Sequence, residues 1–218
     1  LDPVASDLQT EIAGLPLALI DTFAPGTGLE GTLQAKARAT GAMASPQVEA
    51  SYSAAGVRIR RPDTALVPAL SLQGSASLLG QRATVDARVT AGGNTNLTMK
   101  GSGTLPRGGA TVDARIAVGG SIDIAPFAPL LGNDIRNVSG RLRPNLTVSV
   151  SGTQITGTGA IDFDGGALAL PEAGLKLSGG QGRLVLQGDA LQVQSLTFSA
   201  GTGTVTGSGS IRLDATQG

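Results

Sequence analysis

Apolar and polar residues alternate along most of this 218-residue chain. Leu33, Ala35 and Ala37, for example, alternate with Gln34 and Lys36. Successive side chains of a β-strand point to opposite faces, so this period of two predicts strands with one apolar and one polar face. Such strands are typical of antiparallel sheets with water on one side. The pattern recurs to the end of the chain and predicts about twelve to fifteen strands.

Turn-forming sequences separate the predicted strands. Glycine-rich segments predict turns at 91–94, 106–109, 164–166, 179–180, 188–189 and Gly201. The alternation also changes phase between Val193 and Leu196, which predicts a β-bulge at Ser195.

Two apolar stretches, 15–25 and 122–131, do not alternate, and each contains early proline. They predict short amphipathic helices or apolar crossovers between strands. The motif x-Gly-x-Leu follows each stretch, and the second copy comes roughly a hundred residues after the first. We therefore predict three segments: the end of a preceding repeat at 1–14, a first repeat unit at 15–119 and a second at 120–218.

Composition excludes several classes of function. The chain has no His and no Cys, which removes the usual zinc, haem and iron–sulfur ligands and the Ser-His-Asp and Cys-His catalytic sets. Sixteen basic and sixteen acidic residues cancel, so no basic stripe for nucleic acid is expected. We expect no cofactor, no metal and no catalytic residue, and hence a protein that is not an enzyme.

Two local motifs look like ligand sites but have simpler explanations. The alternating glycines at 201–209 lack the lysine and the helix of a phosphate-binding loop. Asp162 and Asp164 lack the third acidic ligand and the later glutamate of a calcium loop, so they predict a hairpin turn.

A sheet with one apolar face must cover it by packing against a second sheet, by closing, or by curling around a ligand. Aromatic residues make up only 2% of the chain, which leaves little bulk to fill an interior. A curled sheet lined by small aliphatic residues leaves a groove that suits hydrocarbon, because burying each CH₂ gains about 0.8 kcal/mol. The predicted lining residues are Leu33, Ala35, Ala37, Val48, Val85, Val89, Val112, Ile116, Leu146, Val148, Ile155, Ile161, Val205 and Ile211.

Residues 15–48 carry the order Leu-Pro-Leu, Pro-Gly-x-Gly-Leu-x-Gly-x-Leu and Gly-x-x-x-x-Pro-x-Val. Related sequences stand at 122–130 and 138–142, and a closing glycine-rich run follows at 186–211. In these motifs the chain resembles the repeats of TamB-type proteins, the translocation and assembly module subunits of the AsmA-like group in Gram-negative envelopes. The second copy lacks the proline that Pro46 supplies in the first.

The resemblance implies an all-β, elongated, curved and mostly antiparallel sheet, taco-like and incompletely closed, with an apolar concave face. It further implies a periplasmic protein anchored in the inner membrane, a TamA-like outer-membrane barrel as partner, and a role in outer-membrane biogenesis. The cargo would be phospholipid acyl chains or unfolded outer-membrane protein. Because the chain begins at Leu1 and its apolar runs are far shorter than the roughly 20 residues of a spanning helix, we expect any signal or anchor outside this sequence.

Two other classes of protein share this composition. An extracellular β-helix adhesin or autotransporter passenger is also rich in glycine and strands, but predicts rungs of roughly 20–30 residues and a filled core. An outer-membrane barrel predicts aromatic girdles, which 2% aromatic residues do not supply. A sheet of this kind also predicts exposed strand edges, through which two copies could pair as a dimer.

Overall fold

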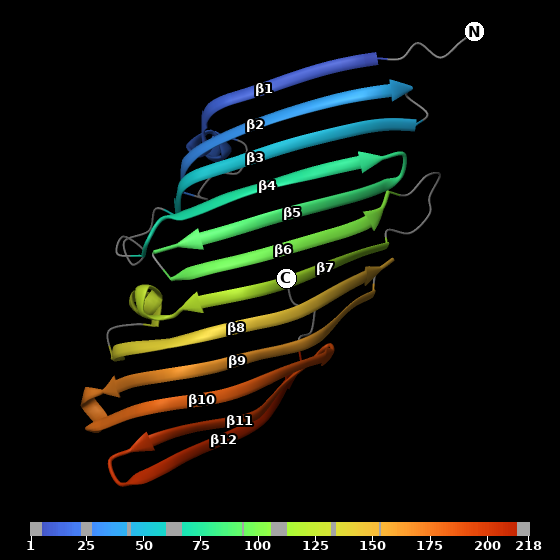
Figure 1. Ribbon diagram of the computed structural model, residues 1–218. Coiled ribbons are helices and arrows are strands. Elements are labelled where there is room, and N and C mark those ends of the chain that lie inside the picture. The colour runs from blue at the N-terminus through green and yellow to red at the C-terminus, as the bar shows by residue number, and fades with distance from the viewer. Residues whose placement is uncertain are drawn as a thin grey trace.

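We describe the protein from a computed structural model, which covers residues 6–22, 28–42, 45–59, 67–92, 94–105, 113–131, 134–152 and 154–212. Twelve strands form one sheet in which their spatial order is their order in the sequence (Figure 1). The strands are β1 (Ser6–Pro16), β2 (Leu29–Ala42), β3 (Ser45–Ile59), β4 (Leu70–Leu79), β5 (Arg82–Ala91), β6 (Thr95–Thr104), β7 (Asp113–Asp123), β8 (Arg136–Ser151), β9 (Gln154–Leu170), β10 (Leu175–Gly188), β11 (Ala190–Ala200) and β12 (Gly203–Arg212).

The alternating sequence explains why these segments are strands. Along β4, half-buried and exposed side chains alternate at every position, as the period of two requires. Every neighbouring pair of strands is antiparallel. The all-β antiparallel fold predicted from the sequence is therefore confirmed, and the described strands do not form the β-helix expected of an adhesin.

The connections divide the sheet into two ends. Because the strands follow one another up and down, the links from odd to even strands lie at one end, on the left in Figure 1. We call this the crossover end, since it holds the 3₁₀ turns η1 (Leu17–Thr22), η3 (Ala125–Leu131) and η4 (Pro171–Ala173). The opposite end, where even strands lead to odd ones, we call the hairpin end. η1 and η3 fall within the two stretches where helices or apolar crossovers were predicted.

Two glycine-rich segments that were predicted to form turns lie within strands instead. The segments 164–166 and 179–180 lie inside β9 and β10 rather than in turns, so both turn predictions are wrong. The turn predicted at 106–109 lies outside the described residues. The pairing of β9 with β10 shifts register beside Gly180, and Gly165 and Gly179 have positive φ angles of 63° and 60°. A positive φ suits a β-bulge as well as a turn. The bulge predicted at Ser195 is confirmed, because the register of β11 against β12 shifts between Val193 and Leu196.

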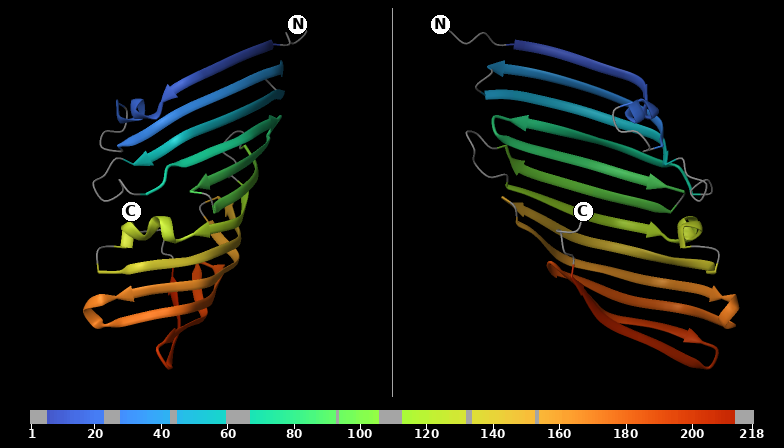
Figure 2. Two further views of the ribbon diagram at one scale, coloured as in Figure 1. Left: turned by 60° about the vertical axis from the view of Figure 1, so that its left-hand side comes forward. Right: turned by 180° about the vertical axis from the view of Figure 1, so that it is seen from behind.

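The sheet is open and single-layered. Its two edges are β1 and β12, and the strand direction rotates progressively between them (Figure 2). In the part of the chain that the structure describes, few apolar residues are buried: Leu17, Ala54, Ala91, Pro144, Ala169, Leu186 and Phe198. Most apolar side chains are therefore half-buried on one face of the sheet, without a second layer to cover them.

Candidate functional site: the apolar face

The predicted lining residues lie on one face of the sheet, which we call the apolar face. Cross-strand pairing places Val85 opposite Ala76, and Ile116 opposite Val148. The residues of the prediction that share this face are Leu33, Ala35, Ala37, Val48, Val85, Val89, Ile116, Leu146, Val148, Ile155, Ile161, Val205 and Ile211. Val112 lies outside the described residues. That these side chains bind a ligand stays a prediction.

One row of facing residues crosses the whole sheet from β1 to β12. Each member lies opposite the next on the neighbouring strand, and the tyrosine hydroxyl is its one polar side-chain group. The row is Ile12, Ala35, Tyr52, Gly74, Ala87, Met99, Val118, Leu146, Gly159, Leu186, Leu191 and Ile211. The apolar face is therefore continuous across the direction of the strands.

The apolar face keeps considerable contact with water. Val85, Ile116 and Ile155 are 37%, 40% and 56% exposed. Contiguous exposed apolar surface of this kind is uncommon on monomeric soluble proteins, which makes this face the candidate site of the described residues. Its burial is favourable by about 25 cal/mol per Å² of area removed from water.

An apolar hollow of about 450 Å³ lies at the hairpin end of β3 to β7. Small residues form much of its wall, and Val85 and Ile116 contribute larger side chains. The apolar-face residues that line it are Val48, Ala50, Ala76, Leu78, Ala83, Val85, Gly101, Gly103, Ala114 and Ile116, joined by Leu105 beyond the end of β6. This volume is within the range of small-molecule sites.

The crossover end of β8 to β11 is filled instead by an aromatic corner. The rings of Phe163 and Phe198 have centroids 5.9 Å apart and are tilted by 52°. Both rings lie close to Gly166, and Phe198 also covers Gly180, where an added methyl group would collide with the ring. Phe198 is only 8% exposed. The sequence analysis did not predict this aromatic corner. Two of the four phenylalanines of the chain lie near glycine pairs in the sequence, and that combination could have indicated it.

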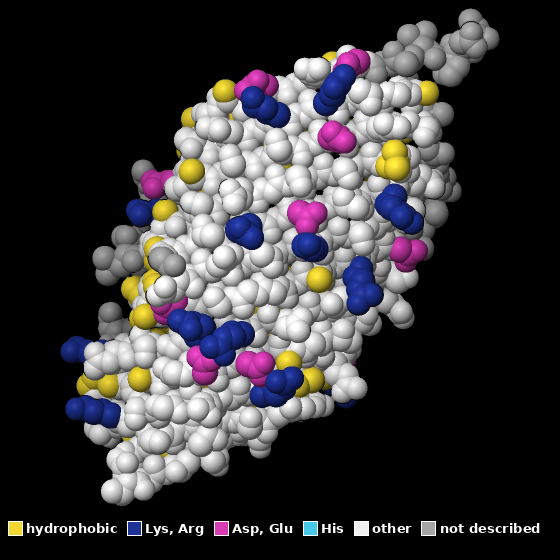
Figure 3. Space-filling model, viewed as in Figure 1, with side chains coloured by type: hydrophobic (Ala, Val, Ile, Leu, Met, Phe, Trp, Pro, Cys, Tyr) yellow, Lys and Arg dark blue, Asp and Glu magenta, His cyan; other side chains and the backbone are white. Residues whose placement is uncertain are grey.

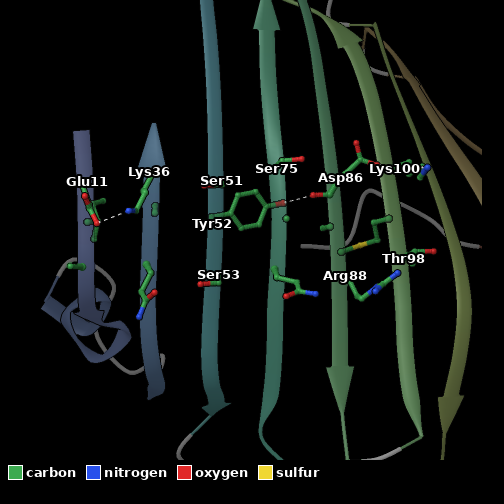
Figure 4. A pocket seen from close by; sticks show the side chains of 18 residues that line it. Glu11, Lys36, Ser51, Tyr52, Ser53, Ser75, Asp86, Arg88, Thr98 and Lys100 are labelled. Atoms are coloured by element: carbon green, nitrogen blue, oxygen red, sulfur yellow. Dashed lines mark hydrogen bonds and ion pairs between the residues drawn. The ribbon is translucent and has the colours of Figure 1, made fainter. Parts of the chain in front are cut away.

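Tyr52 fills a similar gap nearer the middle of the sheet. Its side chain crosses Gly74, and its hydroxyl donates a hydrogen bond to the carbonyl oxygen of Asp86 at 3.2 Å (Figure 4). A second hollow, of about 740 Å³, extends over β1 to β6 around this tyrosine. Its lining residues also include Glu11 and Lys36, whose side chains form an ion pair at 3.1 Å on the opposite, polar face, together with serine, glutamine and other polar residues. Its mixed lining makes it a poorer site for hydrocarbon than the apolar hollow.

The opposite face of the sheet is polar, with Lys, Arg, Asp and Glu spread over it (Figure 3). Several of these charges pair across adjacent strands, as Asp7 does with Arg38 at 2.7 Å. The hydrogen bond from Arg38 lowers the pKa of the Asp7 carboxyl. Because such pairs are exposed, each contributes little stability, but they support the register that keeps all apolar residues on one face.

Asp162 and Asp164 belong to this network of ion pairs. Arg183 binds Asp162 at 2.7 Å, and Arg143 binds Asp164. Both aspartates lie within β9, so the hairpin turn predicted for them is wrong. Each carboxylate is held by an arginine on a neighbouring strand, an arrangement that gives both residues a structural role.

Among the described residues, no group of three or more Asp and Glu side chains is placed to hold a metal ion. The helices within the described ranges are too short to cross a membrane. Comparisons of the chain with protein-family models, with curated proteins and with solved structures find no match.

Proposed function

We propose that the protein is a non-catalytic lipid-binding segment whose apolar face holds the acyl chains of phospholipids. The continuous, half-exposed apolar face with its hollow of about 450 Å³ carries this proposal. Acyl chains need no hydrogen-bond partner. Aliphatic side chains and glycines can bind them through van der Waals contacts, which do not depend on direction. Paired charges on the opposite face keep that side of the sheet in water.

An unfolded segment of an outer-membrane protein is the second candidate ligand. A polypeptide carries backbone N–H and C=O groups that need partners when they leave water. Thr10, Tyr52 and Thr95 are polar side chains on the apolar face. Thr10 lies on the edge strand β1, Tyr52 already donates to the Asp86 carbonyl oxygen, and Thr95 accepts from the Asp123 amide. The apolar face therefore suits hydrocarbon better than a polypeptide backbone.

The resemblance to TamB-type repeats supplies the cellular setting of the proposal. In that setting the protein works in the periplasm of a Gram-negative bacterium, as part of an inner-membrane-anchored protein that acts with a TamA-like outer-membrane barrel. In this setting, a face that binds acyl chains would serve the transfer of lipid towards the outer membrane. Assembly and secretion of outer-membrane proteins is the role that the second candidate ligand would support.

A matched pair of variants on one strand tests the proposal. Ile116→Glu places a carboxylate on the apolar face, whereas Ala117→Glu places the same group on the polar face. We expect detergent-free protein to bind the fluorescent fatty acid cis-parinaric acid, and Ile116→Glu to weaken binding about tenfold or more, because hydrocarbon would have to desolvate the charge. Ala117→Glu should bind as the unmodified protein does. Equal binding by both variants, with unchanged circular dichroism, would contradict the proposal.

A further inference from the structure

The apolar hollow is long across the strands and short along them. It extends from β3 to β7, which is about 19 Å when neighbouring strands lie about 4.8 Å apart. Along each strand it takes in only neighbouring positions of the apolar face, such as Val48 and Ala50 on β3, and these lie about 6.6 Å apart. We infer that the hollow is a subsite for a single acyl chain that lies across the strands, an inference that rests on the proposed function.

A row of facing residues forms the floor of the hollow. Each member lies opposite the next on the neighbouring strand, and the row is Ala50, Ala76, Val85, Gly101 and Ile116. Val85 leans over Gly101, where an added methyl group would collide with it. On β8 the row continues with Val148, whose branched side chain lies opposite Ile116. Alanine and glycine on this floor leave space that runs from strand to strand.

The next row towards the crossover end forms a wall. Its members are Tyr52, Gly74, Ala87, Met99 and Val118. The ring of Tyr52 crosses Gly74, and its hydrogen bond to the carbonyl oxygen of Asp86 holds it there (Figure 4). A hydrocarbon chain lying along a strand would have to cross this wall, whereas a chain lying across the strands runs beside it. The wall therefore favours the second orientation.

The size of the hollow matches one chain. At roughly 30 Å³ for a group of the size of a water molecule or a methylene, about 450 Å³ holds about fifteen carbons. Each chain of a bilayer spans about half of the hydrocarbon core, or about 15 Å, which fits within the span of the hollow. A phospholipid would therefore place one of its two chains in the hollow and the other outside it.

The polarity of the hollow also matches hydrocarbon. Asp113 and Arg115 contribute to its lining, but they alternate with Ala114 and belong to the polar face. The Asp113 carboxylate accepts a hydrogen bond from the Ser151 hydroxyl. The side chains of the floor are aliphatic or absent, so the lining offers a chain no charge to desolvate.

A series of saturated fatty acids from decanoic to docosanoic acid tests this inference through displacement of cis-parinaric acid. We expect binding to tighten severalfold with each added pair of CH₂ groups up to about sixteen carbons, because each pair buries more apolar surface. Beyond that length the added carbons lie outside the hollow, so binding should change little.

Two matched variants test the orientation of the chain. Ala50→Leu and Ala114→Leu add the same bulk at opposite ends of the hollow, on β3 and on β7. Each should shorten the space, so that binding stops tightening at a shorter chain length while decanoic acid still binds within about twofold of the original. Ser51→Leu, on the polar face beside Ala50, is the control and should leave the series unchanged.

The outcomes separate this inference from the proposed function. Affinity that rises evenly up to docosanoic acid would overturn the subsite while leaving an acyl-binding face in place. The same would follow if both alanine variants, with unchanged circular dichroism, weakened acids of every length by one factor, since a chain lying along a strand has no length limit set across the strands. Failure of every acid to bind would overturn the proposed function and the subsite together.

Discussion

The apolar face differs between two of its regions. At the crossover end of β8 to β11, Phe163 and Phe198 fill the space above Gly166 and Gly180. At the hairpin end of β3 to β7, small residues face one another and leave a hollow of about 450 Å³. Both regions contain glycine, and both belong to the same uninterrupted sheet.

The difference shows how this chain uses its few large side chains. Where a glycine lies opposite a ring, the missing side chain makes room for the ring and the region becomes a local core. Where alanine and glycine lie opposite other small residues, such as Ala76 opposite Ala50, no ring fills the space and a hollow remains. We infer that the aromatic corner stabilises the fold while the apolar hollow is available for a ligand.

The largest expected effect is on the aromatic corner. Phe198→Ala should lower the free energy of unfolding by about 3 kcal/mol, because it removes a buried ring and leaves a cavity. Urea unfolding followed by circular dichroism measures this. Val205→Ala, opposite Phe198 on β12 and 44% exposed, is the control and should cost less than about 1 kcal/mol. Similar losses for both variants would show that the corner is not a core.

A smaller loss is expected from adding bulk beneath the ring. In Gly180→Ala the new methyl group meets the Phe198 ring, so the variant should be destabilised by about 2 kcal/mol through overpacking. The same substitution at Gly209 of β12 meets nothing within 4 Å and should change stability little. The two urea midpoints decide the question, and equal midpoints would contradict the packing described for the corner.

In the hollow, added bulk should change binding rather than stability. Ala76→Leu fills part of the apolar hollow and should reduce cis-parinaric acid binding severalfold, with the free energy of unfolding within about 0.5 kcal/mol of the original. Ser75→Leu, on the polar face of the same strand, is the matched control. If Ala76→Leu unfolds as readily as Phe198→Ala, the hollow is a packed core and the contrast between the two regions is wrong.

The smallest effect concerns pH and the ion pairs of the opposite face. Because Arg38 lowers the pKa of Asp7 in the folded protein, the pair contributes its stability above the ordinary carboxyl pKa. That contribution is lost as the pH falls through the lowered pKa. An Asp7→Asn variant should therefore be slightly less stable than the original protein at neutral pH and equally stable in strong acid. A stability difference that does not change with pH would contradict the pairing.

The sequence alone predicted much of the architecture, because alternation depends on local order. Strand type and the sharing of one face by residues as distant as Leu33 and Ile211 followed from the period of two. The sequence did not show whether Gly165 and Gly179 belong to turns or to β-bulges, because both structures use positive φ angles. The pairing across the strand decides between them, and a single sequence does not contain it.

The position of the apolar hollow was equally beyond the sequence. It depends on which small residues face one another, as Ala76 and Ala50 do, and hence on the register of strands joined by connections of differing length. The corner of Phe163 and Phe198 likewise required alignment of β9 and β11 across β10. Local periodicity therefore predicts which side chains share a face of the sheet, whereas the cross-strand register determines where the apolar hollow and the aromatic corner lie.

The most direct test of the central claim is mass spectrometry of lipids extracted from protein that was expressed in a Gram-negative host and purified without detergent. We predict phospholipid in stoichiometric amount, and a clear reduction in the Ile116→Glu variant relative to Ala117→Glu. A folded protein free of lipid, with both variants unchanged, would contradict an acyl-binding apolar face.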